Sequence, residues 1–166
     1  TEDLAVLRAL PNLTVIAPGD PVETRHATKA IVAHEGPCYL RLGRADEVVV
    51  HDADINFRIA RAITVRDGGD VTLVTTGGIL HEAVAAAAEL KQRGVQARVI
   101  SMHTIKPLDR DILIRAAAST GVIITVEEHS LIGGLGGAVA EALAEDFSGP
   151  VAFRRVALKD RFISTA

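Results

Sequence analysis

The sequence predicts an α/β fold, in which helices cover both faces of a mostly parallel sheet. Segments typical of strands alternate along the 166 residues with segments typical of helices of about ten residues or more. Most predicted strands are continuous apolar runs, and such runs are typical of strands buried on both faces of a parallel sheet. The chain contains no internal repeat and no low-complexity segment.

The first part of the chain predicts two helices and two strands. In order, these are a helix over 2–10, a strand over 13–17, a helix over 21–33 and a strand over 38–42. The first helix ends before Pro11, because a proline disfavours helical geometry in the residue that precedes it. Asp20 is a good N-cap for the second helix, and Pro21 suits its first position.

The second part of the chain is more regular. It predicts strands over 60–65, 71–76, 95–100, 121–126 and 151–156, with helices over 79–93, 109–119 and 137–147. Between the two parts, residues 43–57 have no sustained helical or strand period and carry four Asp or Glu residues. We therefore predict a first domain over 1–44, a linker over 45–59 and a second domain over 60–166.

Composition excludes several classes of function. The formal net charge of −3, together with four Phe, one Tyr and no Trp, gives neither a basic surface nor a stacking platform for nucleic acid. One cysteine, Cys38, excludes an internal disulfide framework and CxxC zinc chemistry. No apolar run reaches the ~18 residues that cross a bilayer, so we expect no membrane partner. These features favour a cytoplasmic domain of metabolic type.

The chain begins at Thr1 inside a helical pattern, with Leu4 and Leu7 among its apolar positions. Whole proteins seldom begin inside an amphipathic helix. We therefore expect these residues to be the remainder of a longer chain.

A glycine cluster over 133–137 precedes a predicted helix. Such a loop can hold a phosphate, because backbone N–H groups are exposed at a helix N-terminus. The cluster fails the dinucleotide fingerprint, however, since the third glycine position is Val139 and residues 127–131 separate it from the strand. We favour the interpretation that the glycines permit a tight turn and a close approach of helix and sheet. Residues 75–78 are interpreted in the same way.

Glu127, Glu128 and His129 follow a predicted strand, at the edge where open α/β sheets bind ligands. A carboxylate–imidazole cluster could transfer protons or bind a metal. Successive residues at a strand end point in opposite directions, so all three cannot face one ligand. We favour a polar cluster at an interface or a helix cap. His81 and Glu82 lack the second histidine of HExxH, and no other spacing predicts a metal site.

Arg41 and Arg44 lie at the end of the strand over 38–42. Two guanidinium groups near a sheet edge suit a phosphate, because each offers planar, bidentate donors. The alternative is surface pairing with Asp46, Glu47 or Asp52, and the residues alone leave both open. The predicted ligand edge is therefore near Arg44 and His129.

Several stretches, in order, resemble one known family. They are 2–5, 8–12, 15–18 with Glu23, 36–44, 70–78, 105–109, 125–129, 133–136 and 138–141. The stretches up to residue 44 resemble the end of the pyrimidine-binding domain of the transketolase family, whose members depend on thiamine diphosphate. The later stretches resemble the C-terminal domain of that family, a three-layer domain with a mostly parallel sheet.

The resemblance implies that a complete enzyme moves a two-carbon ketol unit from a ketose phosphate to an aldose phosphate. Thiamine diphosphate carries the carbanion chemistry, while the protein supplies position and electrostatics. By position, Arg44 matches the family arginine that holds the sugar-phosphate terminus. The resemblance assigns no role to Arg41, and it places His129 in a domain that mainly supports dimer contacts.

The resemblance also implies what this segment lacks. The glutamate that activates the aminopyrimidine ring lies upstream of Thr1 in the family, as does a Gly-Pro-Thr-His stretch. The motif that binds diphosphate and magnesium belongs to an N-terminal domain or to a separate subunit. We therefore expect no catalytic residue, no cofactor or metal bound by this segment alone, and no turnover without a homodimeric or heteromeric partner.

Four alternatives compete with this interpretation. Within the superfamily, they are a deoxyxylulose-phosphate synthase and the beta subunit of a 2-oxo-acid dehydrogenase. Outside the superfamily, they are a non-catalytic assembly module and a nucleotide-binding Rossmann domain. The failed dinucleotide fingerprint disfavours the Rossmann domain.

Overall fold

The computed structural model describes residues 2–43, 46–52 and 55–161. Its helices are α1 (Asp3–Arg8), α2 (Pro21–Val32), α3 (Leu80–Gln92, preceded by the 3-10 turn η1, Gly77–Ile79), α4 (Arg110–Thr120) and α5 (Leu135–Asp146). Its strands are β1 (Thr14–Ile16), β2 (Cys38–Leu40), β3 (Ile63–Arg66), β4 (Val71–Thr76), β5 (Ala97–Ser101), β6 (Thr104–Lys106), β7 (Val122–Ser130) and β8 (Ala152–Leu158). Within these described ranges, no helix has the length and apolarity to cross a membrane.

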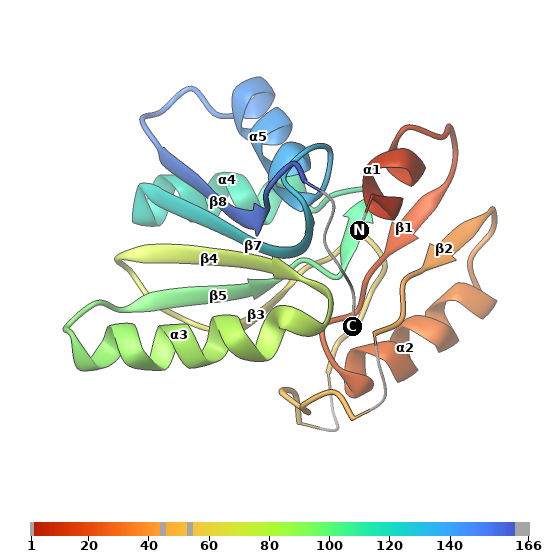
Figure 1. The fold of residues 1–166 in the computed structure, drawn as a ribbon, viewed down its shortest axis with the longest axis horizontal. Helices are drawn as coiled ribbons and strands as arrows, with labels where there is room; N and C mark the ends of the chain where they lie inside the picture. Colours follow the sequence, from red (N-terminus) through yellow and green to blue (C-terminus); the bar gives the residue numbers. More distant parts are fainter. Residues whose placement is uncertain (1, 44–45, 53–54, 162–166) are drawn as a thin grey trace.

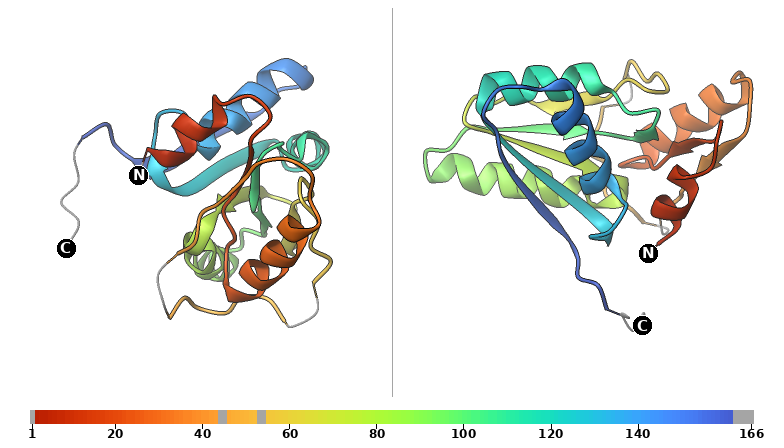
Figure 2. Two further views of the ribbon diagram at one scale, coloured as in Figure 1. Left: turned by 90° about the vertical axis from the view of Figure 1, so that its right-hand side faces the viewer. Right: turned by 90° about the horizontal axis from the view of Figure 1, so that it is seen from above.

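The larger sheet has five strands in the order β3-β5-β4-β7-β8. Strands β5, β4, β7 and β8 run parallel, and only the edge strand β3 is antiparallel to its neighbour. Helix α3 covers one face of the sheet, while α4 and α5 cover the other (Figures 1 and 2). The predicted three-layer α/β fold with a mostly parallel sheet is confirmed.

Alternation along the central strands explains the three layers. Val74, Ile100 and Ile123 pack with α4 and α5 in one buried cluster. Leu73 and Val99, one position away on the same strands, pack with the alanine-rich α3 in another. Because side chains of a strand alternate between its faces, strands that are apolar throughout supply both cores.

The smaller sheet has the order β2-β1-β6. Strands β1 and β2 are parallel, with Ile16 paired to Leu40, whereas β6 is antiparallel to β1, with Ile16 paired to Thr104. The sequence did not predict β6, because three residues carry too little periodicity to signal a strand. By sequence β6 lies in the second predicted domain, yet it completes the sheet of the first.

Strand β7 is longer than predicted. It runs four residues beyond residue 126, so Glu127, Glu128 and His129 lie within the strand. After a register shift that follows Val126, pairing with β8 resumes between Ser130 and Leu158. The expectation that residues 127–131 separate the strand from the glycine cluster was therefore wrong.

The described residues of 46–57 contain no helix and no strand, as the irregular pattern indicated. This segment is nevertheless anchored to the fold. One carboxylate oxygen of Asp20, Oδ2, accepts hydrogen bonds from the backbone N–H groups of Val50 at 2.9 Å and His51 at 2.8 Å. The His51 side chain is buried as a result. The boundaries at 44 and 60 remain a prediction.

Candidate functional site

A pocket of about 360 Å³ lies where the carboxyl ends of β2, β4 and β7 meet. Its lining residues are Pro18, Arg41, Leu42, Gly43, Glu47, Thr76, Gly77, Gly78 and Glu128. Parallel strands bind ligands at this edge because the loops that follow them diverge there. Arg44 lies outside the described residues, and its chain neighbour Gly43 lines the pocket.

Arg41, which lines this pocket, forms contacts with two other elements of the fold. Its Nε atom is 3.2 Å from Asp3 Oδ2 on α1, and its Nη2 atom donates to the Glu128 carbonyl on β7 at 3.1 Å. Burial opposes ionisation of Asp3, but the Arg41 charge and a hydrogen bond from the Tyr39 hydroxyl outweigh it and lower the pKa of Asp3. Arg41 therefore links α1, β2 and β7.

Glu47 was missed as a pocket residue, because the sequence offered it only as a surface partner for the arginines. Its carboxylate packs against two glycines. A Cβ atom added to Gly43 would lie 1.5 Å from Glu47 Oε1, and a Cβ atom added to Gly78 would lie 2.3 Å from the same oxygen. Burial, with the negative charges of Asp20 and Glu128, raises the pKa of Glu47. Both glycines therefore make room for this carboxylate.

The end of β4 is fastened to the end of β1. Gly77 has a positive φ of 71° and donates its N–H to the Ala17 carbonyl at 3.0 Å, and the Thr76 hydroxyl donates to the same carbonyl at 3.3 Å. His81 Nδ1 lies 2.8 Å from the Gly78 carbonyl, and its Nε2 lies 3.3 Å from Glu82 Oε1. The structural interpretation of residues 75–78 agrees with these contacts, which shape the floor of the pocket.

Glu127 caps helix α5. Its two carboxylate oxygens accept the N–H groups of Leu135 at 2.6 Å and Gly136 at 2.7 Å. Burial raises the pKa of Glu127, although these two N–H groups oppose the shift. An ideal Cβ on Gly134 would lie 2.1 Å from Glu127 Oε2, so glycine is required there. The carboxylate of Glu127 occupies the helix N-terminus where a phosphate would bind, and the structural interpretation of the glycine cluster holds.

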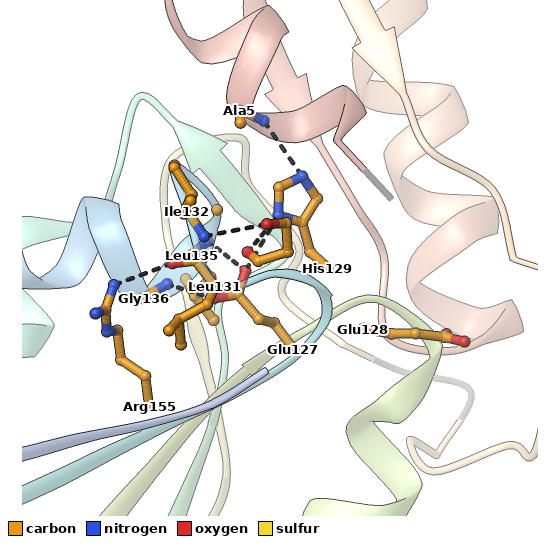
Figure 3. A network of polar contacts seen from close by, with 12 residues as sticks. Ala5, Glu127, Glu128, His129, Leu131, Ile132, Leu135, Gly136 and Arg155 are labelled. Carbon is orange, nitrogen blue, oxygen red and sulfur yellow. Dashed lines mark hydrogen bonds and ion pairs between the residues drawn. The ribbon is translucent and has the colours of Figure 1, made fainter. Parts of the chain in front are cut away.

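His129 is fully buried and joins β7 to α1. Its Nδ1 lies 2.9 Å from the Ser130 carbonyl, and its Nε2 accepts the Ala5 N–H at 3.4 Å, which places the proton on Nδ1. Figure 3 shows Glu127 and His129 within this network and Glu128 directed away from it. The expectation that the three residues cannot face one ligand agrees with this geometry. Of the three, only Glu128 lines the pocket.

A second polar cluster is buried where segment 46–52 meets the start of α2. His51 lies between two carboxylates, with Nδ1 3.2 Å from Asp20 Oδ2 and Nε2 3.4 Å from Glu23 Oε1. Burial opposes ionisation of Asp20, but N–H donors from Glu23, His51 and Val50 outweigh it and lower its pKa. For Glu23, which accepts the Gly19 N–H at 2.6 Å, burial prevails and raises the pKa. These groups attach segment 46–52 to α2.

His103 lies near this second cluster, with its ring stacked on Phe57 at a centroid distance of 4.0 Å. Burial lowers its pKa to about 4, and the nearby His51 adds to that shift. The ring is therefore neutral over the physiological pH range.

Across 2–43, 46–52 and 55–161, no three His, Cys, Asp or Glu side chains are grouped so that they could hold a metal ion.

Comparison with known families matches both parts of the chain. Residues 60–166 match the family described as transketolase, C-terminal domain, and residues 1–47 match transketolase, pyrimidine binding domain. These two matches follow the chain order that the resemblance implied.

Individual relatives agree. The chain is 42% identical to a 6-deoxy-6-sulfo-D-fructose transketolase subunit of Clostridium sp. (strain MSTE9), over 97% of this chain and 49% of that protein. It is 41% identical to an apulose-4-phosphate transketolase subunit of Phocaeicola vulgatus, over 95% of this chain and 50% of that protein. It is 39% identical to 1-deoxy-D-xylulose-5-phosphate synthase 1 of Geobacter sulfurreducens, over 97% of this chain and 26% of that protein. The chain thus spans about half the length of the two transketolase subunits, and about a quarter of the synthase.

Similarity to solved structures also extends over nearly the whole chain, as one example shows. That structure is described as a split gene transketolase, inactive beta4 tetramer, and it superposes with a TM-score of 0.92 at 43% identity, over 96% of this chain and 52% of that one.

Proposed function

Because this chain belongs to the transketolase family, we propose that it is the C-terminal part, or C-terminal subunit, of an enzyme that moves two-carbon ketol units between sugar phosphates. The pocket at the carboxyl ends of β2, β4 and β7 carries this proposal. It is lined by residues from both family domains, with Gly43 on one side and Thr76 and Glu128 on the other. A sugar phosphate that reached this pocket would contact both domains.

Within this proposal, Arg44 binds the phosphate terminus of the sugar. The guanidinium group offers paired donors to phosphate oxygens, and the residue follows Gly43 at the pocket wall. Arg41 lines the same pocket, where it bonds to Asp3 and to the Glu128 carbonyl, and we assign it the role of linking these elements. The carboxylates of Glu47 and Glu128 disfavour a phosphate on their side of the pocket, which leaves that side to the hydroxyl groups of the sugar.

Thiamine diphosphate and magnesium belong to the complete enzyme in this proposal, where the cofactor supplies the carbanion chemistry. We assign the metal ligands to a partner that carries the diphosphate-binding domain, because this chain matches the pyrimidine-binding and C-terminal domains of the family. Relatives that are themselves named as subunits support a heteromeric partner. The solved relative described as an inactive beta4 tetramer supports self-association and inactivity of this chain alone. A cytoplasmic location follows the expectation from composition.

The test uses the full-length protein with its partner subunit, thiamine diphosphate and magnesium. We expect ketol transfer from a ketose phosphate to ribose 5-phosphate, and none from this chain alone. Consumption of pyruvate with glyceraldehyde 3-phosphate instead would favour the deoxyxylulose-phosphate synthase alternative, which the Geobacter relative keeps open. Turnover by the isolated 166 residues would contradict the proposal, and a complex that binds no thiamine diphosphate would favour an assembly module.

A further inference from the structure

A groove of about 540 Å³ lies beside the edge strand β3, between that strand and α4. The turn after β3 and the start of β5 complete its walls, so it lies toward the amino ends of the parallel strands. The pocket lined by Gly43 and Glu128 lies at the opposite, carboxyl ends of these strands. Three arginines line the groove, namely Arg66 of β3, Arg98 of β5 and Arg115 of α4.

Arg98 is held in a fixed orientation. Its Nε donates to Asp67 Oδ1 at 3.0 Å, and its Nη1 donates to the Ser119 hydroxyl at 2.7 Å. The side chain is only 20% exposed, so the strand, the turn and the helix all restrict it. A guanidinium group has five N–H donors, and these contacts use two. The remaining donors can bind a ligand at a smaller entropic cost, because the side chain is already held in one rotamer.

Arg66 and Arg115 are different. In the part of the chain that the structure describes, neither side chain forms an ion pair or a hydrogen bond. Among the described residues that line the groove, Asp67 is the only one with a carboxylate, and it already binds Arg98. The groove lining therefore carries three positive charges against one negative charge, and the three arginines come from three separate elements.

A purely structural role explains only part of this arrangement. The helix dipole favours cations near the last turn of α4, which accounts for Arg98 beside Ser119 but not for Arg115, which lies in the middle of that helix. Arg66 lies on the edge strand β3, where the helix dipole gives no comparable reason for a cation. An unpaired guanidinium on the same groove as two others raises mutual repulsion, which a bound anion would remove.

We propose that this groove binds a small phosphorylated anion, either a free diphosphate or the phosphate group of a metabolite. Phosphate accepts several guanidinium donors at once, and Arg98 provides a rigid anchor beside the adaptable Arg66 and Arg115. A diphosphate can bridge two arginines, whereas inorganic phosphate can engage fewer donors. This site is independent of the proposed ketol transfer and rests on none of its residues.

Isothermal titration calorimetry of the full-length protein at low ionic strength tests this, with pyrophosphate, inorganic phosphate and ribose 5-phosphate as ligands. The variants are Arg66→Gln and Arg115→Gln, neither of which removes a contact that holds the described fold. Arg154→Gln is the matched control, because Arg154 is an exposed arginine on the other edge strand, β8, and its loss changes the net charge equally. Thermal unfolding confirms that each variant is folded.

We expect pyrophosphate to bind more tightly than inorganic phosphate, and each groove variant to weaken it about tenfold or more, the effect of one charged hydrogen bond. Arg154→Gln should change the affinity less than about twofold. Because ribose 5-phosphate is also the acceptor proposed for the other pocket, only binding that Arg66→Gln or Arg115→Gln weakens is counted for the groove. Tighter binding of ribose 5-phosphate than of pyrophosphate by that measure would assign the groove to metabolites, and the reverse order to free diphosphate. Equal weakening by all three variants, or no heat at about 10 mM pyrophosphate, overturns the proposal, since a millimolar site would then be nearly full.

Discussion

Asp20 and His51, which are 31 residues apart, are joined at two points: Asp20 Oδ2 accepts the His51 backbone N–H at 2.8 Å and lies 3.2 Å from its ring Nδ1. The same carboxylate caps α2 by accepting the Glu23 N–H at 2.8 Å. One fully buried side chain therefore starts a helix and fixes the segment between the two parts of the fold.

Replacement of Asp20 should therefore be costly. Asp20→Asn keeps the size of the side chain but presents one oxygen to three backbone donors, and we expect it to lower the free energy of unfolding by about 2–4 kcal/mol. Urea denaturation of the chain measures this. Asp52→Asn is the control, because Asp52 is exposed on the same segment. A loss no larger than that of the control would contradict the role assigned to Asp20.

Stability should also fall at mildly acidic pH through His103. Its pKa is lowered to about 4 by burial, whereas an unfolded histidine titrates near ~6.5. The folded state therefore favours the neutral ring, and this contribution is complete above the unfolded pKa and is lost as pH falls from about 6.5 to 4. Proton NMR of the His103 ring checks the pKa, and denaturation across that window checks the slope.

The matched variant for that experiment is His103→Gln, which removes the titrating ring. We expect its unfolding free energy to change less between pH 6.5 and 4, a window set by the two pKa values, than that of the wild type. An equal slope in both proteins would show that other groups cause the pH dependence.

Replacement of either Glu127 or Gly134 should lower the stability of the protein, because both are needed for the cap of α5. Glu127→Gln leaves one of two buried N–H groups without an oxygen, at a cost of about 1.5–3 kcal/mol. Gly134→Ala places a methyl group 2.1 Å from Glu127 Oε2 and 2.5 Å from His129 Nδ1, so the cap must move. Thermal unfolding compares both with Gly69→Ala, where a Cβ meets no atom within 4 Å. A Gly134→Ala protein as stable as that control would refute the cap.

Arg44→Ala tests the proposed substrate contact in the complete enzyme. We expect KM for phosphorylated acceptors to rise about tenfold to a hundredfold, the equivalent of about 1.5–3 kcal/mol. KM for the same acceptor without its phosphate should not change, and Arg154→Ala should leave both values unaltered. Steady-state kinetics with the paired acceptors decides it; an equal rise for both acceptors would indicate a structural role for Arg44.

Local signals in the sequence predicted much of the fold. Asp20 caps α2 as its position indicated, because an N-cap is recognised within one turn of its helix. Strand β4 has the predicted bounds, since the turn at residues 67–70 and the glycines after it limit a fully buried run.

Contacts between distant residues were not predictable in this way. Glu127 caps a helix that begins eight residues later, and only the folded path of β7 brings the two together. Glu47 enters the pocket because Gly43 and Gly78, which lie far apart in the sequence, both leave space for it. Arg44, the residue on which the site prediction depends, lies outside the described residues, so its role stays a prediction.

The position of β6 beside β1 bears on how such enzymes can be recombined. Residues 60–166 correspond to one family domain, and a gene exchange at that boundary would look like a clean swap of modules. Such a swap would nevertheless transplant an edge strand of the neighbouring sheet, whose register is set by pairing between Val15 and Lys106. Hybrids between relatives should therefore fold only where β6 of the donor pairs well with β1 of the host. The two family domains are thus not independent modules for exchange.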